Sequence, residues 1–241
     1  MTSPAILCVP ADNRKYLDGC RSFGVPVMLD AEDGVRPENR HAALDNAVAF
    51  ATRGDFVRAG REDIVETGAL ARLRESGATY VVPKCEGAVV VGCVALIETP
   101  LGVRRLDEII RSGPSSVFFG WADLSATCRV LPTSRLVEHA ECEVLFAAKA
   151  AGLRVIRGPS QYIERAAKCH EDALRARDLG YDGVGCVSPA QIKAVELAFR
   201  PGVERIEWAR AILDAASDGA FSDGRIVAGP PLVKLAHWIL S

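Results

Sequence analysis

The stretch from Cys93 to Asp123, CVALIETPLGVRRLDEIIRSGPSSVFFGWAD, carries the clearest indication of the fold. It holds two short apolar runs, Cys93–Ile97 and Val117–Gly120, which are too short for helices and therefore favour strands. Glu98 follows the first run directly, and Asp123 follows the second after a two-residue gap. These two acids are 25 positions apart in the sequence, about the length of one strand plus one helix. The spacing therefore predicts two neighbouring parallel strands whose carboxyl ends carry Glu98 and Asp123.

The same alternation of apolar runs and amphipathic stretches extends over most of the chain. The predicted strands are Ala5–Val9, Val25–Leu29, Asp55–Val57, Tyr80–Val82, Cys93–Ile97, Val117–Gly120, Arg154–Ile156 and Gly183–Val187. The predicted helices are Glu38–Ala51, Asp63–Ser76, Ser134–Ala151, Ser160–Leu179 and Pro189–Phe199. This alternation in a chain of 241 residues predicts an α/β fold, a (β/α)8 TIM barrel, which typically needs ~250 residues. An open doubly wound sheet is the alternative, although no glycine-rich nucleotide-binding motif follows any strand.

Two segments depart from a regular barrel. Only Cys85–Gly92 separate Lys84 from the next strand, whereas a parallel crossover usually needs a dozen or more residues. The fourth crossover is therefore predicted to be shortened, with a short helix, an irregular link or no helix. We expect residues 1–200 to form the barrel and residues 201–241 to form a C-terminal helical extension. The helices predicted in the extension are Glu204–Ala216 and Pro231–Leu240.

The composition excludes several classes of partner. Lys and Arg number 29 against 31 Asp and Glu, so the chain has no basic field for nucleic acid and no polybasic handle for a membrane. No stretch approaches the ~18 apolar residues of a spanning helix, and the N-terminus does not resemble a signal peptide. The eight cysteines show no C-x-x-C spacing and are predicted to be reduced thiols. These features predict a cytoplasmic protein that binds a small molecule.

Charged residues follow six consecutive predicted strands and would meet at one rim of the barrel. Glu98 and Asp123 are candidate Mg²⁺ ligands, because Mg²⁺ is usually held by one or two carboxylates together with water and substrate. Three further acids could orient the bound waters as a second shell: Asp30, Glu32 and Asp33. The alternative is that the acids only form ion pairs with Arg58 and Lys84.

These residues lie in ordered motifs that cover nearly the whole chain. The motifs are Val9–Lys15, Leu29–Val35, Phe56–Arg58, Val82–Glu86, Ala95–Val103, Phe119–Ser125 and, more weakly, Leu179–Gly183 and Ser188–Ile192. The set resembles the superfamily of citrate lyase beta-subunits and malyl-CoA lyases, which includes the 2-oxo-diacid aldolases.

The resemblance implies a Mg²⁺-dependent carbon–carbon lyase or aldolase that works through an enolate. It implies that Glu98 and Asp123 bind Mg²⁺ and that Arg58 binds the substrate carboxylate or carbonyl. The substrate would be a small-molecule carboxylate or an acyl thioester. The resemblance also implies a homo-oligomer, a trimer or hexamer, with the extension packing on a neighbouring subunit.

The chain departs from the family pattern at four positions. Val184 stands where many relatives have Lys, Ser188 where they have His, and Arg157 where they have Asp. Ala228, in the stretch Ile226–Pro230, stands where acyl-CoA lyases have a catalytic Asp. An alanine cannot transfer a proton, so these departures point away from standard malyl-CoA cleavage.

Three further residues are candidate substrate contacts, and two other functions stay open. Lys84 and Arg157 could contact the substrate, and Trp121 could form a wall of the pocket. Arg157 could instead form a salt bridge to Asp123 or Glu98. The alternatives to a lyase are an acyl-CoA thioester hydrolase and a catalytically silent barrel that acts as a partner subunit or ligand-binding protein.

Overall fold

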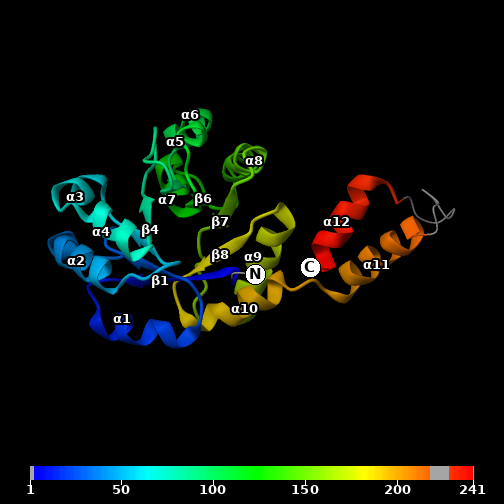
Figure 1. Ribbon diagram of the computed structural model, residues 1–241, viewed down its shortest axis with the longest axis horizontal. Coiled ribbons are helices and arrows are strands. Elements are labelled where there is room, and N and C mark those ends of the chain that lie inside the picture. The colour runs from blue at the N-terminus through cyan, green and yellow to red at the C-terminus, as the bar shows by residue number, and fades with distance from the viewer. Residues whose placement is uncertain (1–2, 218–227, 241) are drawn as a thin grey trace. The chain divides into compact units, whose positions relative to one another are not determined.

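The computed structural model describes residues 3–217 and 228–240, and its strands form a closed parallel barrel in the order β1 to β8 (Figure 1). The strands are β1 Ala5–Pro10, β2 Val27–Asp30, β3 Phe56–Arg58, β4 Thr79–Val82, β5 Val94–Ile97, β6 Ser116–Phe119, β7 Arg154–Arg157 and β8 Gly183–Cys186. The ring closes where β1 pairs with β8, with Ile6 opposite Gly185. Each predicted strand overlaps an observed one, and the closed ring excludes the doubly wound alternative.

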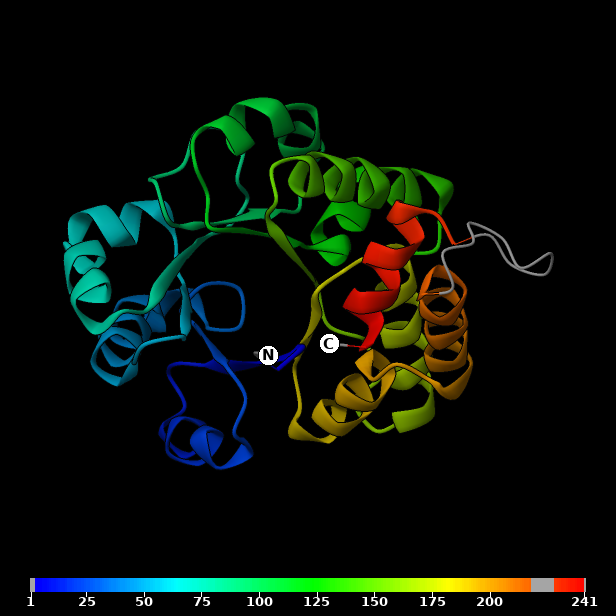
Figure 2. The ribbon, with the colours of Figure 1, turned by 45° about the vertical axis from the view of Figure 1, so that its right-hand side comes forward.

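The first compact unit, residues 1–197, carries the barrel, with helices around the outside of the strands (Figure 2). Its helices are α1 Arg14–Cys20, α2 Arg40–Phe50, α3 Arg61–Glu66, α4 Ala69–Ser76, α5 Pro100–Arg104, α6 Leu106–Arg111, α7 Trp121–Cys128, α8 Arg135–Ala150, α9 Ala166–Leu179 and α10 Pro189–Phe199, the last running to the start of the second unit. This covering explains why the strands are apolar on both faces.

Two predicted helices differ from the observed ones. The prediction of one helix over Asp63–Ser76 was wrong, because the chain forms α3 and α4 with a break at Gly68, whose φ of +63° is left-handed. The predicted helix Ser160–Leu179 begins only at Ala166. Gln191 holds the segment before α9 as a loop, because its amide nitrogen donates to the carbonyls of Ser160 and Tyr162 at 2.9 and 3.2 Å.

The fourth crossover contains no helix. Residues 83–93 run from β4 to β5 as an irregular link, and a chain of that length can extend to about 36 Å. That reach is enough to return along a four-residue strand, which rises only ~13 Å. The link is held by backbone bonds from Cys85 to the carbonyl of Leu96 (3.0 Å) and from Gly92 to that of Gly113 (3.0 Å). The predicted shortening of this crossover is therefore confirmed.

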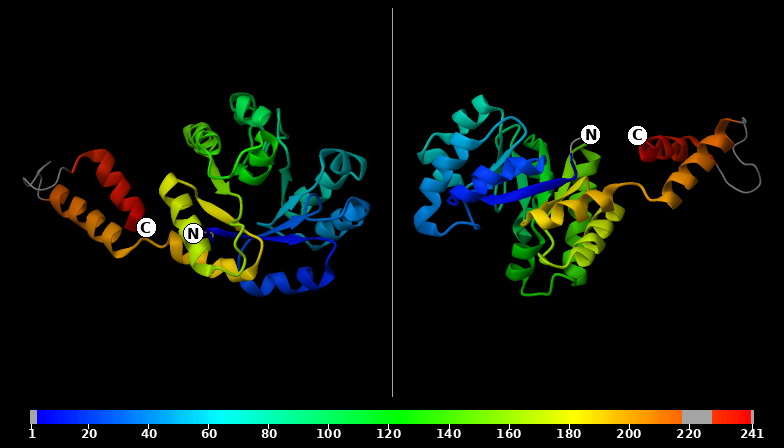
Figure 3. Two further views of the ribbon diagram at one scale, coloured as in Figure 1. Left: turned by 180° about the vertical axis from the view of Figure 1, so that it is seen from behind. Right: turned by 90° about the horizontal axis from the view of Figure 1, so that it is seen from below.

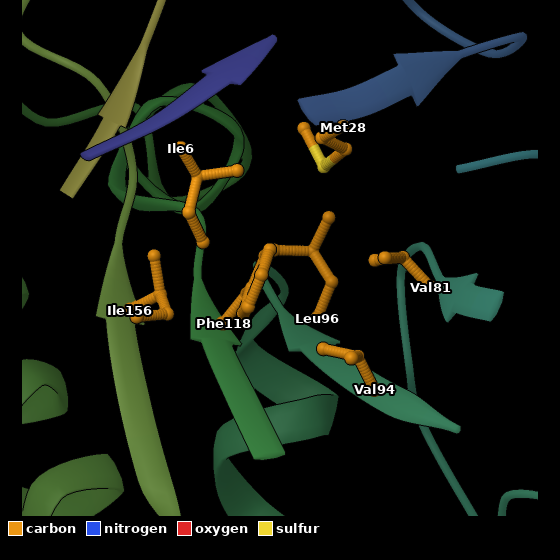
Figure 4. Packing of buried hydrophobic residues seen from close by; sticks show 7 residues of the cluster. All are labelled: Ile6, Met28, Val81, Val94, Leu96, Phe118 and Ile156. Atoms are coloured by element: carbon orange, nitrogen blue, oxygen red, sulfur yellow. The ribbon is translucent and has the colours of Figure 1, made fainter. Parts of the chain in front are cut away.

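An apolar plug fills the barrel interior. It is formed by Ile6, Met28, Val81, Val94, Leu96, Phe118 and Ile156, which point toward one another from six strands (Figure 4). The eighth strand contributes glycines instead. A Cβ on Gly183 would lie 2.4 Å from the carbonyl oxygen of Pro4 and 3.0 Å from Ile156 Cδ1. At β8, other segments of the same chain approach so closely that they occupy the space that side chains fill on the other strands.

The second compact unit, residues 198–241, contains a helical hairpin of α11 Val203–Ser217 and α12 Pro230–Leu240 (Figure 3). The two helices share a small core formed by Ala209, Ile212, Ala215, Ala228, Ala236 and Ile239. Ala228 is buried in this core, whereas Ile226 and Val227 of the tail motif lie outside the described residues. Among the described helices, none combines the length and the apolar character that crossing a membrane requires.

Gly183→Ala tests the close packing at β8. The added methyl would clash with backbone, so we expect the free energy of unfolding to fall by about 1–3 kcal/mol. Gly19→Ala is the matched control, because Gly19 lies in α1 and no heavy atom comes within 4 Å of the place its added methyl would take. The control should be neutral or gain up to ~1 kcal/mol. Urea unfolding of both variants measures the difference, and equal stabilities would contradict the packing account.

Candidate active site

The alternation of side chains along the strands places a charged layer directly above the apolar plug. Met28 lies in the plug, and the side chain two residues later, Asp30, faces the same way. The same step of two residues leads from Leu96 to Glu98. These residues stand at the carboxyl ends of β2 and β5, the end of such barrels where chemistry occurs.

Arg58, at the end of β3, is clamped by Asp30. Its Nε donates to Asp30 Oδ1 at 2.9 Å and its Nη2 to Oδ2 at 2.6 Å, which is a bidentate ion pair. Burial opposes the charge on Arg58, but the hydrogen bonds and the charge of Asp30 outweigh it, so the Arg58 pKa is raised. The guanidinium is therefore always charged and held in one orientation.

The loop after β2 fixes Asp30 in turn. Asp30 Oδ1 accepts from the backbone N–H of Glu32 at 3.0 Å, and Oδ2 accepts from that of Gly34 at 2.9 Å. A Cβ at Gly34 would lie 2.3 Å from Asp30 Oδ2, so only glycine allows the loop to close on this carboxylate. Asp30 thus has its acceptor sites filled by Arg58 and by its own loop.

Through its ammonium group, Lys84 connects the loop after β4 to the loop after β2. Its Nζ donates to Glu32 Oε1 and to Asp33 Oδ2, the latter at 2.8 Å. Glu32 Oε2 also lies 3.7 Å from Arg58 Nη1. Asp30, Glu32 and Asp33 therefore form ion pairs with Arg58 and Lys84. The sequence left this arrangement open beside the other one, in which the three acids orient the waters bound to Mg²⁺.

Lys84 also contacts Glu98 through its backbone. Its φ of +45° is left-handed, which is unusual for a residue with a side chain and costs backbone energy. In this conformation its N–H donates to Glu98 Oε1 at 2.8 Å. The strained residue therefore orients the carboxylate of Glu98, a contribution that no side-chain pattern in the sequence could reveal.

Glu98 is the most deeply buried acid of the rim, with 1% of its surface exposed. Burial raises the pKa of Glu98 to about 7; the Lys84 N–H opposes this rise, and the nearby charge of Asp123 adds to it. Unlike Asp30, Glu32 and Asp33, Glu98 has no Lys or Arg within ion-pair distance among the described residues. A buried carboxylate without a cation is costly, and an incoming cation would relieve that cost.

Asp123, in the first turn of α7, lies near enough to Glu98 for its charge to raise the Glu98 pKa, and its side chain has no hydrogen bond or ion pair within the described part of the chain. Gly120 lets the start of α7 come close to Glu98, because a Cβ at position 120 would lie 2.6 Å from both Cβ and Oε2 of Glu98. Glu98 and Asp123 thus offer free carboxylate oxygens, the hard donors that suit Mg²⁺. No cluster of three or more His, Cys, Asp or Glu with metal-site geometry occurs among the described residues, so water or substrate would complete the coordination.

Arg157 does not form the salt bridge to Asp123 or Glu98 that was one of its two predicted alternatives. Its Nε donates instead to Glu141 Oε1 on α8, at 2.7 Å. Ile156 points into the barrel, so Arg157 faces the outer side of the sheet, toward the helices. The strand alternation could have revealed this placement from the sequence, but the partner Glu141 could not be identified there.

Three other residues that the sequence singled out have contacts that support the fold. The Nε1 of Trp121 donates to the carbonyl of Pro159 at 3.2 Å, so this side chain is anchored to the loop after β7. Val184 is buried in β8, and the Ser188 Oγ accepts from the N–H of Ala190 at 3.3 Å at the start of α10. Neither position carries the Lys or His that the family resemblance led us to look for there.

Comparison with known proteins gives one family. The family model described as HpcH/HpaI aldolase/citrate lyase matches residues 65–189, just over half of the chain. A citrate lyase subunit beta-like protein of Mycobacterium tuberculosis is 29% identical over 95% of this chain and 92% of its own length. A (3S)-malyl-CoA thioesterase of Cereibacter sphaeroides is 26% identical over 92% of this chain and 88% of its own length.

A solved structure of a similar protein has the same fold. The protein CitE from Mycobacterium tuberculosis, in complex with magnesium, acetoacetate and coenzyme A, matches 99% of this chain and 97% of its own, with a TM-score of 0.87 and 27% identity. The likeness extends over both compact units of the chain.

Glu98→Gln tests the cost of the buried carboxylate in the metal-free protein. The folded-state pKa of about 7 lies above the ordinary value of 4.5, so the stability due to protonated Glu98 is complete below pH 4.5 and lost as the pH rises to about 7. Glutamine removes this loss. We expect the variant to exceed the wild type by on the order of 1–3 kcal/mol at pH 8, and the difference to shrink at pH 5.

Urea unfolding in EDTA at the two pH values makes this comparison. Asp107→Asn is the control, because Asp107 is exposed (84%) and its loss should not change the pH dependence. Parallel pH profiles for wild type and Glu98→Gln would show that the buried carboxylate is not destabilised.

Proposed function

Because the chain belongs to the HpcH/HpaI aldolase/citrate lyase family, we propose that it is a Mg²⁺-dependent carbon–carbon lyase or aldolase. The substrate would be a β-hydroxy acid, a 2-oxo acid or an acyl thioester. The observation that carries the proposal is the pair of carboxylates without cationic partners, Glu98 and Asp123, beside the immobilised guanidinium of Arg58. We also propose, from the family resemblance, a homo-oligomer such as a trimer or hexamer.

Glu98 and Asp123 are the proposed Mg²⁺ ligands. The backbone N–H of Lys84 occupies one oxygen of Glu98 and leaves Oε2 available on the side of Gly120. When bound, Mg²⁺ supplies a Lewis acid that stabilises negative charge on a substrate oxygen. The magnesium in the related mycobacterial structure supports this assignment.

Arg58 is the proposed substrate-binding cation. Of its five N–H groups, two bond Asp30 and Nη1 lies 3.7 Å from Glu32 Oε2, so we propose that the N–H groups outside these contacts bind a substrate carboxylate or carbonyl oxygen. Since Asp30 fixes the guanidinium before the substrate arrives, little reorganisation is needed as charge develops on the substrate. Lys84, tied to Glu32 and Asp33, completes the positive side of the rim.

The reaction that suits this arrangement breaks the bond between the hydroxyl-bearing carbon and the carbon next to a carbonyl. The hydroxyl loses its proton to a base, its oxygen becomes a new carbonyl, and the electron pair of the broken bond forms an enolate. A proton then returns to the enolate carbon. Arg58 would stabilise the developing oxyanion, and the alanine at position 228 supplies no group for the proton transfers.

Thioester hydrolysis is the second candidate. The similarity to a (3S)-malyl-CoA thioesterase favours it, because the same polarised carbonyl would accept water as the nucleophile. The two reactions differ in their products, since hydrolysis releases a free thiol without cleaving the carbon skeleton.

Calorimetric titration with MgCl₂ at pH 8 tests the metal site. We expect the wild type to bind, and Glu98→Gln and Asp123→Asn each to weaken binding by about tenfold or more, because each removes a ligand. Asp107→Asn should bind as the wild type does. Lowering the pH below about 7 should also weaken binding, since a proton then competes for Glu98. Wild-type binding no tighter than in the two ligand variants would rule the site out.

Arg58→Lys tests the substrate contact. A lysine keeps the charge but loses the two-pronged grip, so kcat/KM should fall by about 10²-fold. A panel of β-hydroxy acids, free and as thioesters, supplies the assay, with cleavage products and free thiol measured separately. Arg61→Lys, an exposed arginine at the start of α3, is the control. Mg²⁺ binding without turnover of any panel member would favour the catalytically silent barrel.

A further inference from the structure

A buried charge cluster lies between β7 and α8, outside the barrel interior. Glu141 of α8 has 1% of its surface exposed and Arg157 of β7 has 9%. Besides the 2.7 Å bond from Arg157, Glu141 accepts from Arg175 at 3.3 Å and from the Tyr181 hydroxyl at 3.4 Å. A buried ion pair contributes little net stability compared with apolar side chains of the same size. Stability alone therefore does not account for the pair.

Arg157 also contacts Trp121. The guanidinium carbon lies 5.8 Å from the centre of the indole ring, within the range of a cation–π interaction. The next two residues hold the same ring. Pro159 accepts the indole N–H at 3.2 Å, and a Cβ on Gly158 would lie 3.3 Å from Cδ1 and Nε1 of Trp121. The end of β7 thus fixes the indole through three successive residues.

Trp121 connects this anchor to the candidate metal site. It is the first residue of α7, and its carbonyl accepts from Ser125 Oγ at 2.6 Å. Asp123 lies two residues further on in the same turn. Gly120, the residue before Trp121, packs against Glu98. A rotation of the first turn of α7 would therefore move Asp123 relative to Glu98.

We infer that Arg157, held by Glu141, is a positioning residue that fixes Trp121 and so places Asp123 opposite Glu98. The inference rests on the proposed role of Asp123 as a metal ligand. It replaces the predicted role of Arg157 as a substrate contact. An arginine suits this role because its planar group can stack on the indole while Nε bonds the acid, whereas a lysine ammonium has no flat face.

The experiment follows Trp121 fluorescence and Mg²⁺ affinity in the full-length protein. The other tryptophans, Trp208 and Trp238, are replaced by phenylalanine so that Trp121 alone reports. In this background we compare two changes. Arg157→Lys keeps the charge of the pair, and Arg157→Met combined with Glu141→Gln removes both charges while leaving Tyr181 an oxygen acceptor.

Arg175→Met is the matched control. It also removes a cation bonded to Glu141, but no hydrogen bond or cation–π pair joins Arg175 to Trp121 in the described residues. Chemical unfolding of every variant separates loss of stability from loss of positioning. The double variant leaves no unpaired buried charge, so it should fold with nearly the stability of the background protein.

We expect both Arg157 changes to shift the Trp121 emission and lower its anisotropy, and to weaken Mg²⁺ binding by about tenfold, the usual effect of losing a residue that orients a ligand. The Arg175 control should leave emission and affinity unchanged. Unchanged emission and affinity in the Arg157 variants would overturn the inference, as would an equal change in the control. If Asp123→Asn binds Mg²⁺ normally, the proposed metal site fails instead, whatever the emission shows.

Discussion

In a closed barrel of parallel strands, neighbouring side chains on a strand must face opposite sides of the sheet. This constraint determines most of what the molecule can do. It directs Ile6, Met28 and Leu96 into the apolar plug, and two residues later it directs Asp30 and Glu98 to the mouth. It also sends Arg157 to the outer surface of the sheet, where an acid on α8 meets it. The position of a residue on its strand thus determines whether its side chain faces the barrel interior or the surrounding helices.

The charges at the mouth fall into two groups with different consequences. Asp30, Glu32 and Asp33 are paired with Arg58 and Lys84 in one ion-pair network, which holds the Arg58 guanidinium in place. Glu98 is buried deeper than these acids, has no such cation, and holds its proton more tightly than usual. The paired group orients the guanidinium, and the uncompensated group provides the attraction for a metal ion.

Much of this could be predicted from the sequence because it depends on local pattern. Short apolar runs ending in acids indicated the strands, and the spacing of Glu98 and Asp123 placed them on adjacent ones. Contacts between distant elements could not be predicted. The partner of Arg157 lies on α8, and Gln191 holds residues before α9 out of the helix. The break at Gly68 and the left-handed Lys84 depend on backbone angles that hydrophobic periodicity does not encode.

The link between β4 and β5 has a consequence for how such a barrel can vary. A crossover helix can change its length only by steps that keep its apolar face toward the sheet. The link has no helical period to keep, because backbone bonds such as those of Cys85 and Gly92 fix it to its neighbours, and its residues 90–92 are exposed. Lengthening a flexible connection costs little entropy. The exposed part of the link, residues 90–92, is therefore where residues can be gained or lost in evolution, or a peptide inserted by design, while Lys84 and the strand register stay the same.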